Sequence, residues 1–334
     1  MPQDPVVRGQ ARASLLLTKV RSLRGVNHGA EDFLAKELTW LAKYQSDVNF
    51  RAQNLNTWLL ARLAALYKNA GDVTRSLMLT DAPGNPAYRD PAKVEAILKF
   101  QKTAHSAFDQ FLVRNYQYKA GQLMELQALD SLYHGNFPAA LDYLKNAGDE
   151  ARNHPIYADP FTARIVDCHD CELKDNPVTT LEAFTEKMAQ LAETAQGTGA
   201  DAANASLLLG NAFYNMSYYG NGRAIYNTHF QNLVPDRYGT NGISDSDLAL
   251  NQDMAEKFYN RAASLTSDKE LRAKATFLAA KAEQNRWYNT HPDDDNSNGH
   301  AGKYFAALKA SFSDTEYYKE VVNECGYFKK YVGQ

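Results

Sequence analysis

The chain has 334 residues, of which 44% are hydrophobic and 22% are charged, so it can bury a sizeable core and is not a disordered sequence. A formal net charge of -3, without a clustered stripe of Lys and Arg, excludes the basic face that a nucleic-acid partner requires. The longest uncharged stretch, 202–222, is interrupted by Asn204, Asn211 and Asn215, among others, and is too polar to cross a bilayer. We therefore expect no nucleic-acid partner and no transmembrane segment.

Helical periodicity dominates the chain from its start, and strand-like alternation is nearly lacking. About the first 45 residues predict an amphipathic helix pair, and 56–79 predict a helical hairpin with its turn at Ala70-Gly71-Asp72. Residues 93–112 and 116–129 predict two longer helices. In the first pair, the residues expected on the inner side are Phe33, Leu34, Leu38, Trp40 and Leu41.

Two further hairpins follow the same spacing. In 128–147, Gly135 marks the turn and Ala140, Leu144 and Ala147 line the second helix. The next begins with a helix around 205–214, and its partner helix arrives late, at 254–262. The intervening insertion, 220–247, is rich in Gly, Asn, Asp and Tyr, and loops of this length in a compact array are uncommon and tend to be functional or mobile.

The C-terminal part predicts three more helices. The first runs from Asp268 to about Tyr288, with Ser267 and Glu270 as a capping box at its start. The final pair is expected at 303–311 and 314–331. The chain as a whole predicts about 12 to 14 helices, hence six or seven hairpins.

The hairpins at 56–79, 128–147 and 205–262 resemble the tetratricopeptide repeat in their small-residue, aromatic and Gly-turn spacing. The match is degenerate, because Ser131 replaces the usual aromatic residue and Ser267 stands where a proline often ends the unit. The resemblance implies an all-α, right-handed α-solenoid with one long loop insertion. A single array would span 1–334: N-terminal hairpins in 1–150, a Cys-x-x-Cys connector and a helix in 151–200, and C-terminal hairpins in 201–334.

The C-terminal half, through segments such as DCHDC, LLLGNAFYNMSYYGN and TEYYKEVVNECGYFKKY, also resembles uncharacterised repeat proteins of Bacteroidota cell envelopes. This resemblance implies a periplasmic or outer-membrane-associated setting without giving an activity. The first residues show no signal-peptide pattern, as would also be expected of a cytoplasmic protein. A cytoplasmic location therefore stays open as an alternative.

The sharpest local motif is the Cys-x-x-Cys pair Cys168 and Cys171, with His169 between them. Two thiolates at this spacing can bind zinc, with His169 or a distant residue among the remaining ligands. The same pair can form a local disulfide, remain as structural thiols, or act as a redox pair, although no βαβ pattern surrounds it. Zinc is the one cofactor that the sequence suggests, and no cofactor is the main expectation.

The segment from Asp294 to Gly299 matches the opening of a calcium loop, but its twelfth position holds Phe305 in place of the required Glu. We therefore expect a solvated acidic loop. Cys325 follows two valines on an apolar face and is expected to be a buried, inert thiol.

Tyrosines gather in and beside the insertion. Tyr214 and its neighbour Phe213 are expected to pack between helices, whereas the expected partner- or ligand-binding residues are Tyr218, Tyr219, Tyr226 and Tyr238. Of these, Tyr218, Tyr219 and Tyr226 are the stronger candidates for exposure.

No nucleophile elbow, phosphate loop, dinucleotide fingerprint or metalloprotease motif occurs in the chain. The sequence therefore predicts no catalytic residues and no enzyme, but a scaffold that binds a protein partner. Two alternatives stay open: a glycan- or peptide-binding module that uses the Tyr- and Asn-rich insertion, and an enzyme whose catalytic residues are dispersed along the sequence.

Overall fold

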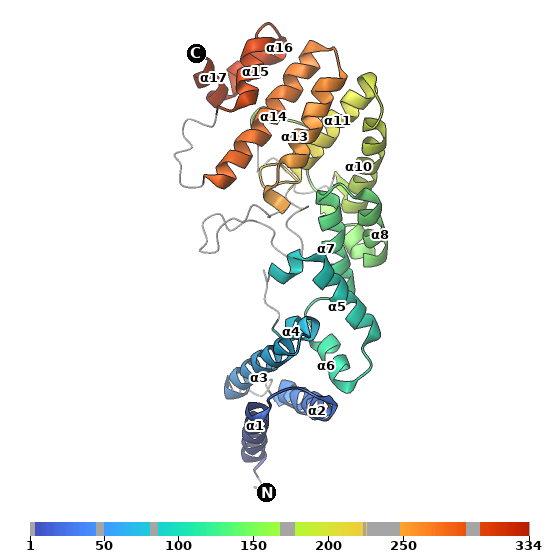
Figure 1. Ribbon diagram of the computed structural model, residues 1–334, viewed down its shortest axis with the longest axis vertical. Helices are drawn as coiled ribbons and strands as arrows, with labels where there is room; N and C mark the ends of the chain where they lie inside the picture. The colour runs from blue at the N-terminus through green and yellow to red at the C-terminus, as the bar shows by residue number, and fades with distance from the viewer. Residues whose placement is uncertain are drawn as a thin grey trace. The chain divides into compact units, whose positions relative to one another are not determined.

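The computed structural model describes residues 4–44, 50–80, 86–167, 178–222, 225, 248–291 and 301–333. The chain divides into two compact units, 1–123 and 124–334, with the division inside one helix, α7 (Ala120–Tyr133). The secondary structure of the described residues is almost entirely helical (Figure 1), which confirms the all-α class. A short antiparallel pair of strands, β1 (Pro155–Ile156) and β2 (Thr179–Thr180), places Pro155 opposite Thr180.

Unit 1 holds the helices that the N-terminal periodicity predicts. They are α1 (Pro5–Ser22), α2 (His28–Tyr44), α3 (Phe50–Asn69), α4 (Val73–Leu79), the 3-10 helix η2 (Pro86–Arg89), α5 (Pro91–Thr103) and α6 (Ala107–Asn115). Of the inner residues predicted on α2, Leu34, Leu38 and Leu41 are fully buried, while Phe33 and Trp40 are half-buried. The hairpin turn predicted at Gly71 is confirmed, because α3 ends at Asn69 and Asp72 caps α4.

The long helix predicted at 93–112 is wrong, because the chain forms two helices there. Helix α5 ends at Thr103, and α6 begins at Ala107. The Oγ of Ser106 accepts a hydrogen bond from the backbone N–H of Asp109 at 3.0 Å, which caps the new helix. Ser106, which lies within an apolar-periodic stretch, therefore marks the start of a new helix and not the middle of a long one.

Unit 2 continues from α7 through α8 (Phe137–Ala147) and α9 (Asp149–Arg152) to α10 (Leu181–Ala195) and α11 (Gly199–Asn215). It then contains the 3-10 helix η3 (Leu248–Leu250), α13 (Asp253–Leu265), α14 (Lys269–Thr290), α15 (Lys303–Phe312), α16 (Glu316–Glu324) and α17 (Gly326–Val332). Helices α10, α11, α13 and α14 lie side by side in sequence order (Figure 1), each packed on the next. The predicted pairing of α11 with the late helix α13 is confirmed.

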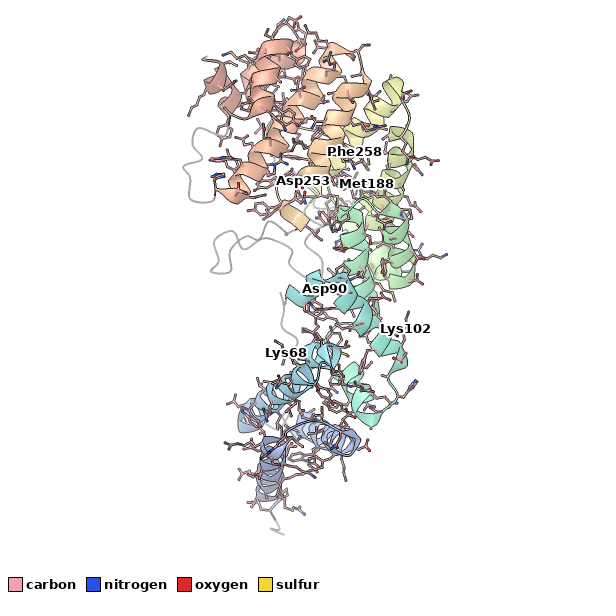
Figure 2. The ribbon with its side chains drawn as sticks, in the orientation of Figure 1. Lys68, Asp90, Lys102, Met188, Asp253 and Phe258 are labelled. Carbon is pink, nitrogen blue, oxygen red and sulfur yellow. The ribbon has the colours of Figure 1, made fainter. Side chains whose placement is uncertain are left out.

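The core of unit 2 is built from apolar and aromatic side chains between these helices. Met188 of α10 is fully buried, and Figure 2 labels it together with Phe258 of α13. The rings of Phe258 and of Phe213 on α11 stack with their centroids 5.6 Å apart. Gly135 has a φ of +73°, which suits the turn between α7 and α8 that the sequence predicts. None of the helices in the described ranges is long and apolar enough to cross a membrane.

The capping box predicted at Ser267 and Glu270 is wrong, since Asp268 is the cap of α14 and its Oδ1 accepts from the N–H of Glu270. The carboxylate of Glu270 instead accepts hydrogen bonds from the N–H groups of Glu316 and Tyr317, at 2.9 Å each. Glu270 therefore caps a different helix, α16.

The helix predicted at 314–331 is also wrong as a single element, because it breaks at Cys325 into α16 and α17. The backbone of Cys325 is extended, and Gly326, a weak helix former, follows it. The break lets Phe328 of α17 turn inward, where its ring lies 5.0 Å from that of Phe305 and 5.3 Å from that of Tyr318.

Candidate functional site: an aromatic pocket in unit 2

A non-helical segment, residues 159–167, runs across α11 and α14; we call it the strap. Two asparagines one helical turn apart on α11 hold its main chain. The Nδ2 of Asn215 donates to the carbonyl oxygens of Pro160 and Thr162, at 3.0 Å each, and that of Asn211 donates to Phe161 O at 2.8 Å. The polar residues of the uncharged stretch therefore fix a backbone segment in place.

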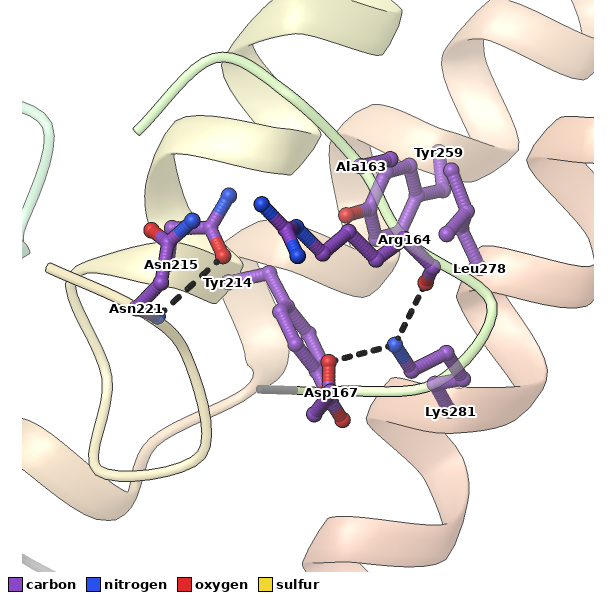
Figure 3. Close-up of a pocket in the computed structure, with 9 residues that line it drawn as sticks. All are labelled: Ala163, Arg164, Asp167, Tyr214, Asn215, Asn221, Tyr259, Leu278 and Lys281. Atoms are coloured by element: carbon purple, nitrogen blue, oxygen red, sulfur yellow. Dashed lines mark hydrogen bonds and ion pairs between the residues drawn. The ribbon is translucent and has the colours of Figure 1, made fainter. Parts of the chain in front are cut away.

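A buried lysine on α14 fixes the end of the strap (Figure 3). The Nζ of Lys281 lies 2.6 Å from Asp167 Oδ1 and donates to the carbonyl oxygen of Arg164 at 2.8 Å. The hydroxyl of Tyr214 donates to the other carboxylate oxygen of Asp167 at 2.6 Å. The Lys281 ammonium also lies 4.8 Å from the ring centroid of Tyr214, within cation–π range.

Burial is the largest cause of the pKa shifts of Lys281 and Tyr214 in this cluster. Burial lowers the pKa of Lys281, and the charge of Asp167 opposes that shift. Burial, and then the charge of Asp167, raise the pKa of Tyr214 well above its usual value, so this phenol stays neutral and donates. Both carboxylate oxygens of Asp167 are engaged, which suits a group that anchors the strap more than one that takes part in a reaction.

Beside this cluster lies a cavity of about 260 Å³, formed by the end of the strap, α11, α14, α15 and the junction of α16 with α17. We call it the aromatic pocket, after the five rings in its lining: Tyr214, Phe277, Tyr288, Phe305 and Tyr327. Its rim exposes apolar surface, because Val166 is 58% exposed and Tyr327 is 39% exposed. An apolar pocket with an exposed apolar rim is a feature of binding sites.

A second cavity under the strap, drawn in Figure 3, has a volume of only about 10 Å³. It is lined by, among others, Ala163, Tyr259 and Leu278. This volume is about that of one water molecule, so the cavity offers no room for a larger ligand.

Cys325 lines the aromatic pocket and is half-buried, so the prediction of a buried thiol is only partly met. Burial raises the pKa of its thiol, which therefore stays protonated near neutral pH. A protonated thiol is a poor nucleophile and a poor metal ligand, in keeping with the predicted inertness.

Among the described residues, the tyrosines that the sequence singled out do not form one exposed surface. Tyr214 and Phe213 are buried, as predicted. Tyr219 is only 8% exposed and its hydroxyl donates to Asn289 Oδ1, so the expected exposure of Tyr219 is wrong. Tyr218 is half-buried, with its ring edge-to-face on that of Tyr219 at 5.4 Å.

The other predicted site residues lie outside the described residues: Tyr226, Tyr238, Cys168, His169, Cys171 and the calcium-like segment 294–299. In the part of the chain that the structure describes, no group of three His, Cys, Asp or Glu side chains is arranged to hold a metal ion. The disulfide, zinc and thiol interpretations of the Cys-x-x-Cys pair therefore stay predictions.

The sequence interpretation missed Lys281 and Asp167. A signal was present, since Lys281 follows Ala279 and Ala280 and precedes Ala282 on the inner side of a helix, where a lysine needs a buried partner. That partner is 114 residues away and follows no motif. Comparisons of the chain with family models, with curated proteins and with solved structures gave no match.

Proposed function

We propose that the chain is a tetratricopeptide-like α-solenoid that serves as a protein–protein interaction scaffold. The sequential packing of α10, α11, α13, α14 and α15 supports this proposal, because contacts between sequence neighbours are the pattern of repeat proteins. The turns at Gly71 and Gly135, on which the resemblance depends, form where the sequence predicts them.

The observation that carries the proposal is the aromatic pocket. Its exposed rim residues, Val166 and Tyr327, are among the few large hydrophobic side chains at the surface of the described residues. Interfaces concentrate their binding energy in such places, where an anchor residue of the partner enters a pocket lined by aromatic side chains. The partner would thus contact the C-terminal unit at the end of the strap.

One further feature fits a binding role. The polar groups of Asp167 and Lys281 hold the strap, so the pocket offers shape, aromatic surface and charge to a partner. The cell envelope is the setting we propose, on the sequence resemblance alone.

The proposal is tested by affinity capture of the tagged protein from its native cells, with mass spectrometry of the associated proteins. The pocket variant carries Val166→Gln and Tyr327→Ala. The matched control carries Val178→Gln and Trp58→Ala, whose side chains are 47% and 39% exposed and do not line the pocket. We expect the same proteins to accompany the wild type and the control and to be lost from the pocket variant. Equal recovery with all three chains would contradict the proposal.

A further inference from the structure

We propose that the aromatic pocket takes up an arginine side chain from the protein partner. This inference rests on the proposed function, because it names the anchor residue that the partner presents. It is carried by the ring composition of the pocket, by its charge and by one acceptor in its lining.

The rings come first. Five aromatic side chains line one cavity of about 260 Å³, which is large enough for a long side chain. Aromatic faces attract cations, and the flat guanidinium group of arginine also stacks on them. The pocket already shows this preference within the chain, since the Lys281 ammonium lies 4.8 Å from the centre of the Tyr214 ring.

The charge of the lining favours the same occupant. Three charged side chains line the pocket: Asp167, Lys281 and Glu324. Asp167 and Lys281 neutralise each other at 2.6 Å, which leaves the carboxylate of Glu324 in excess. Glu324 is exposed, and no described cation pairs with it. It is also the last residue of α16, at the negative end of the helix dipole.

Gln284 supplies an acceptor for the guanidinium group. Its Nε2 donates to the hydroxyl of Tyr288 at 2.7 Å, and its Oε1 accepts no hydrogen bond from a described residue. A guanidinium group has five N–H donors, so it can bond Gln284 and Glu324 while its plane rests on an aromatic ring. A neutral side chain of the same shape keeps its N–H donors and its stacking, but it loses the cation–π attraction and the charge-assisted bond to Glu324.

The test compares two probes, N-acetyl-arginine amide and N-acetyl-citrulline amide, which have nearly the same shape and differ in charge. Binding to the full chain is measured by ligand-observed NMR at 50 mM salt. We expect arginine to bind about tenfold more tightly than citrulline, and this advantage to shrink at 500 mM salt because salt screens exposed charges. Equal binding of the two probes, or no binding of the arginine probe, would overturn the inference without any variant.

Two variants test whether the charge of Glu324 is the one that attracts the arginine probe. Glu324→Gln should reduce arginine binding toward the level of citrulline, leaving only the contribution of the rings. The control is Glu320→Gln, an exposed glutamate one turn earlier on α16 that does not line the pocket, and it should leave arginine binding unchanged. Equal losses from both variants would show a general surface effect and sink the inference. In the capture experiment, retention of the partner by Glu324→Gln but not by the pocket variant would reject the arginine and keep the scaffold. Retention by both would reject the scaffold as well.

Discussion

The side-chain nitrogen of Lys281 and the Oδ1 of Asp167 lie 2.6 Å apart, although 114 residues separate them in the sequence. The lysine side chain is about one-tenth exposed, whereas that of Asp167 is 31% exposed. If the ion pair is broken, water can therefore solvate the Asp167 carboxylate more readily than the Lys281 ammonium. This pair fastens the strap to α14 and forms one wall of the aromatic pocket.

The difference in exposure predicts unequal effects of the two single substitutions. Asp167→Ala leaves a buried ammonium without its carboxylate and should lower the free energy of unfolding by about 3 kcal/mol. Lys281→Met fills the same space with an apolar side chain and leaves a carboxylate that water reaches, so it should cost about 1 kcal/mol. Urea unfolding followed by circular dichroism measures both, and a larger loss from Lys281→Met would contradict this account.

Buried tyrosines predict a loss of stability at alkaline pH. Burial raises the pKa of Tyr259 well above its usual value, so in the folded state it keeps its proton after an unfolded tyrosine, with a pKa of about 10, has lost it. Its contribution is therefore complete below pH 10 and is lost as the pH rises further. The pKa of Lys281 is lowered, so the titration of this lysine makes the free energy of unfolding rise with pH, mainly below about pH 10.4, the pKa of an unfolded lysine.

The measurement for this prediction is urea unfolding between pH 10 and 11.5 for the wild type and for Tyr259→Phe. The substitution keeps the ring and removes the titrating hydroxyl. We expect the free energy of unfolding to fall less steeply with pH in the variant. Identical slopes would show that Tyr259 does not contribute to the alkaline loss.

Close packing of α11 on α13 predicts that Gly210→Ala is destabilising. A Cβ at this position would lie 2.5 Å from Cδ1 of Tyr259, whose ring is buried. Alanine normally favours a helix interior by about 1 kcal/mol over glycine, but the clash should outweigh this gain and give a net loss of about 2 kcal/mol. Gly25→Ala is the control, since nothing lies within 4 Å of its Cβ position. A melting temperature unchanged by Gly210→Ala would show that the helices can separate freely.

The remote helix cap predicts a measurable cost for Glu270→Ala. This substitution removes the acceptor for the N–H groups of Glu316 and Tyr317, and the loss of a helix cap typically costs about 1 kcal/mol. Glu320→Ala removes a negative charge from α16 itself but no cap, so it should cost less. Urea unfolding compares the two, and equal costs would mean that the loss comes from the charge alone.

The elements that the sequence predicts well are those decided locally. The turns at Gly71 and Gly135 follow from residues within a few positions, and so does the helical period around them. The wrong predictions concern side chains that bond to residues far away in the sequence, or that could take either of two local roles. Ser106 could cap a helix or lie within one, and in the folded chain it caps α6.

The site was less predictable than the fold for the same reason. Glu270 caps a helix that begins 46 residues later, and Asp167 meets Lys281 only because the strap crosses α14. Tyr219 was expected to be exposed because it lies beside the insertion, but its hydroxyl donates to Asn289 Oδ1, 70 residues later in the sequence, inside the structure. Short-range patterns cannot distinguish a solvated polar residue from one that is paired across the fold.

The most direct test of the central claim is site-specific photocrosslinking in the native cells. A photoreactive phenylalanine, p-benzoylphenylalanine, replaces Tyr327 at the rim of the aromatic pocket, or Trp58, which is 39% exposed like Tyr327 but belongs to unit 1. The account predicts that position 327 crosslinks to a discrete protein partner and that position 58 does not. Crosslinking from neither position, or from position 58 alone, would contradict the claim that the aromatic pocket is where this protein binds its partner.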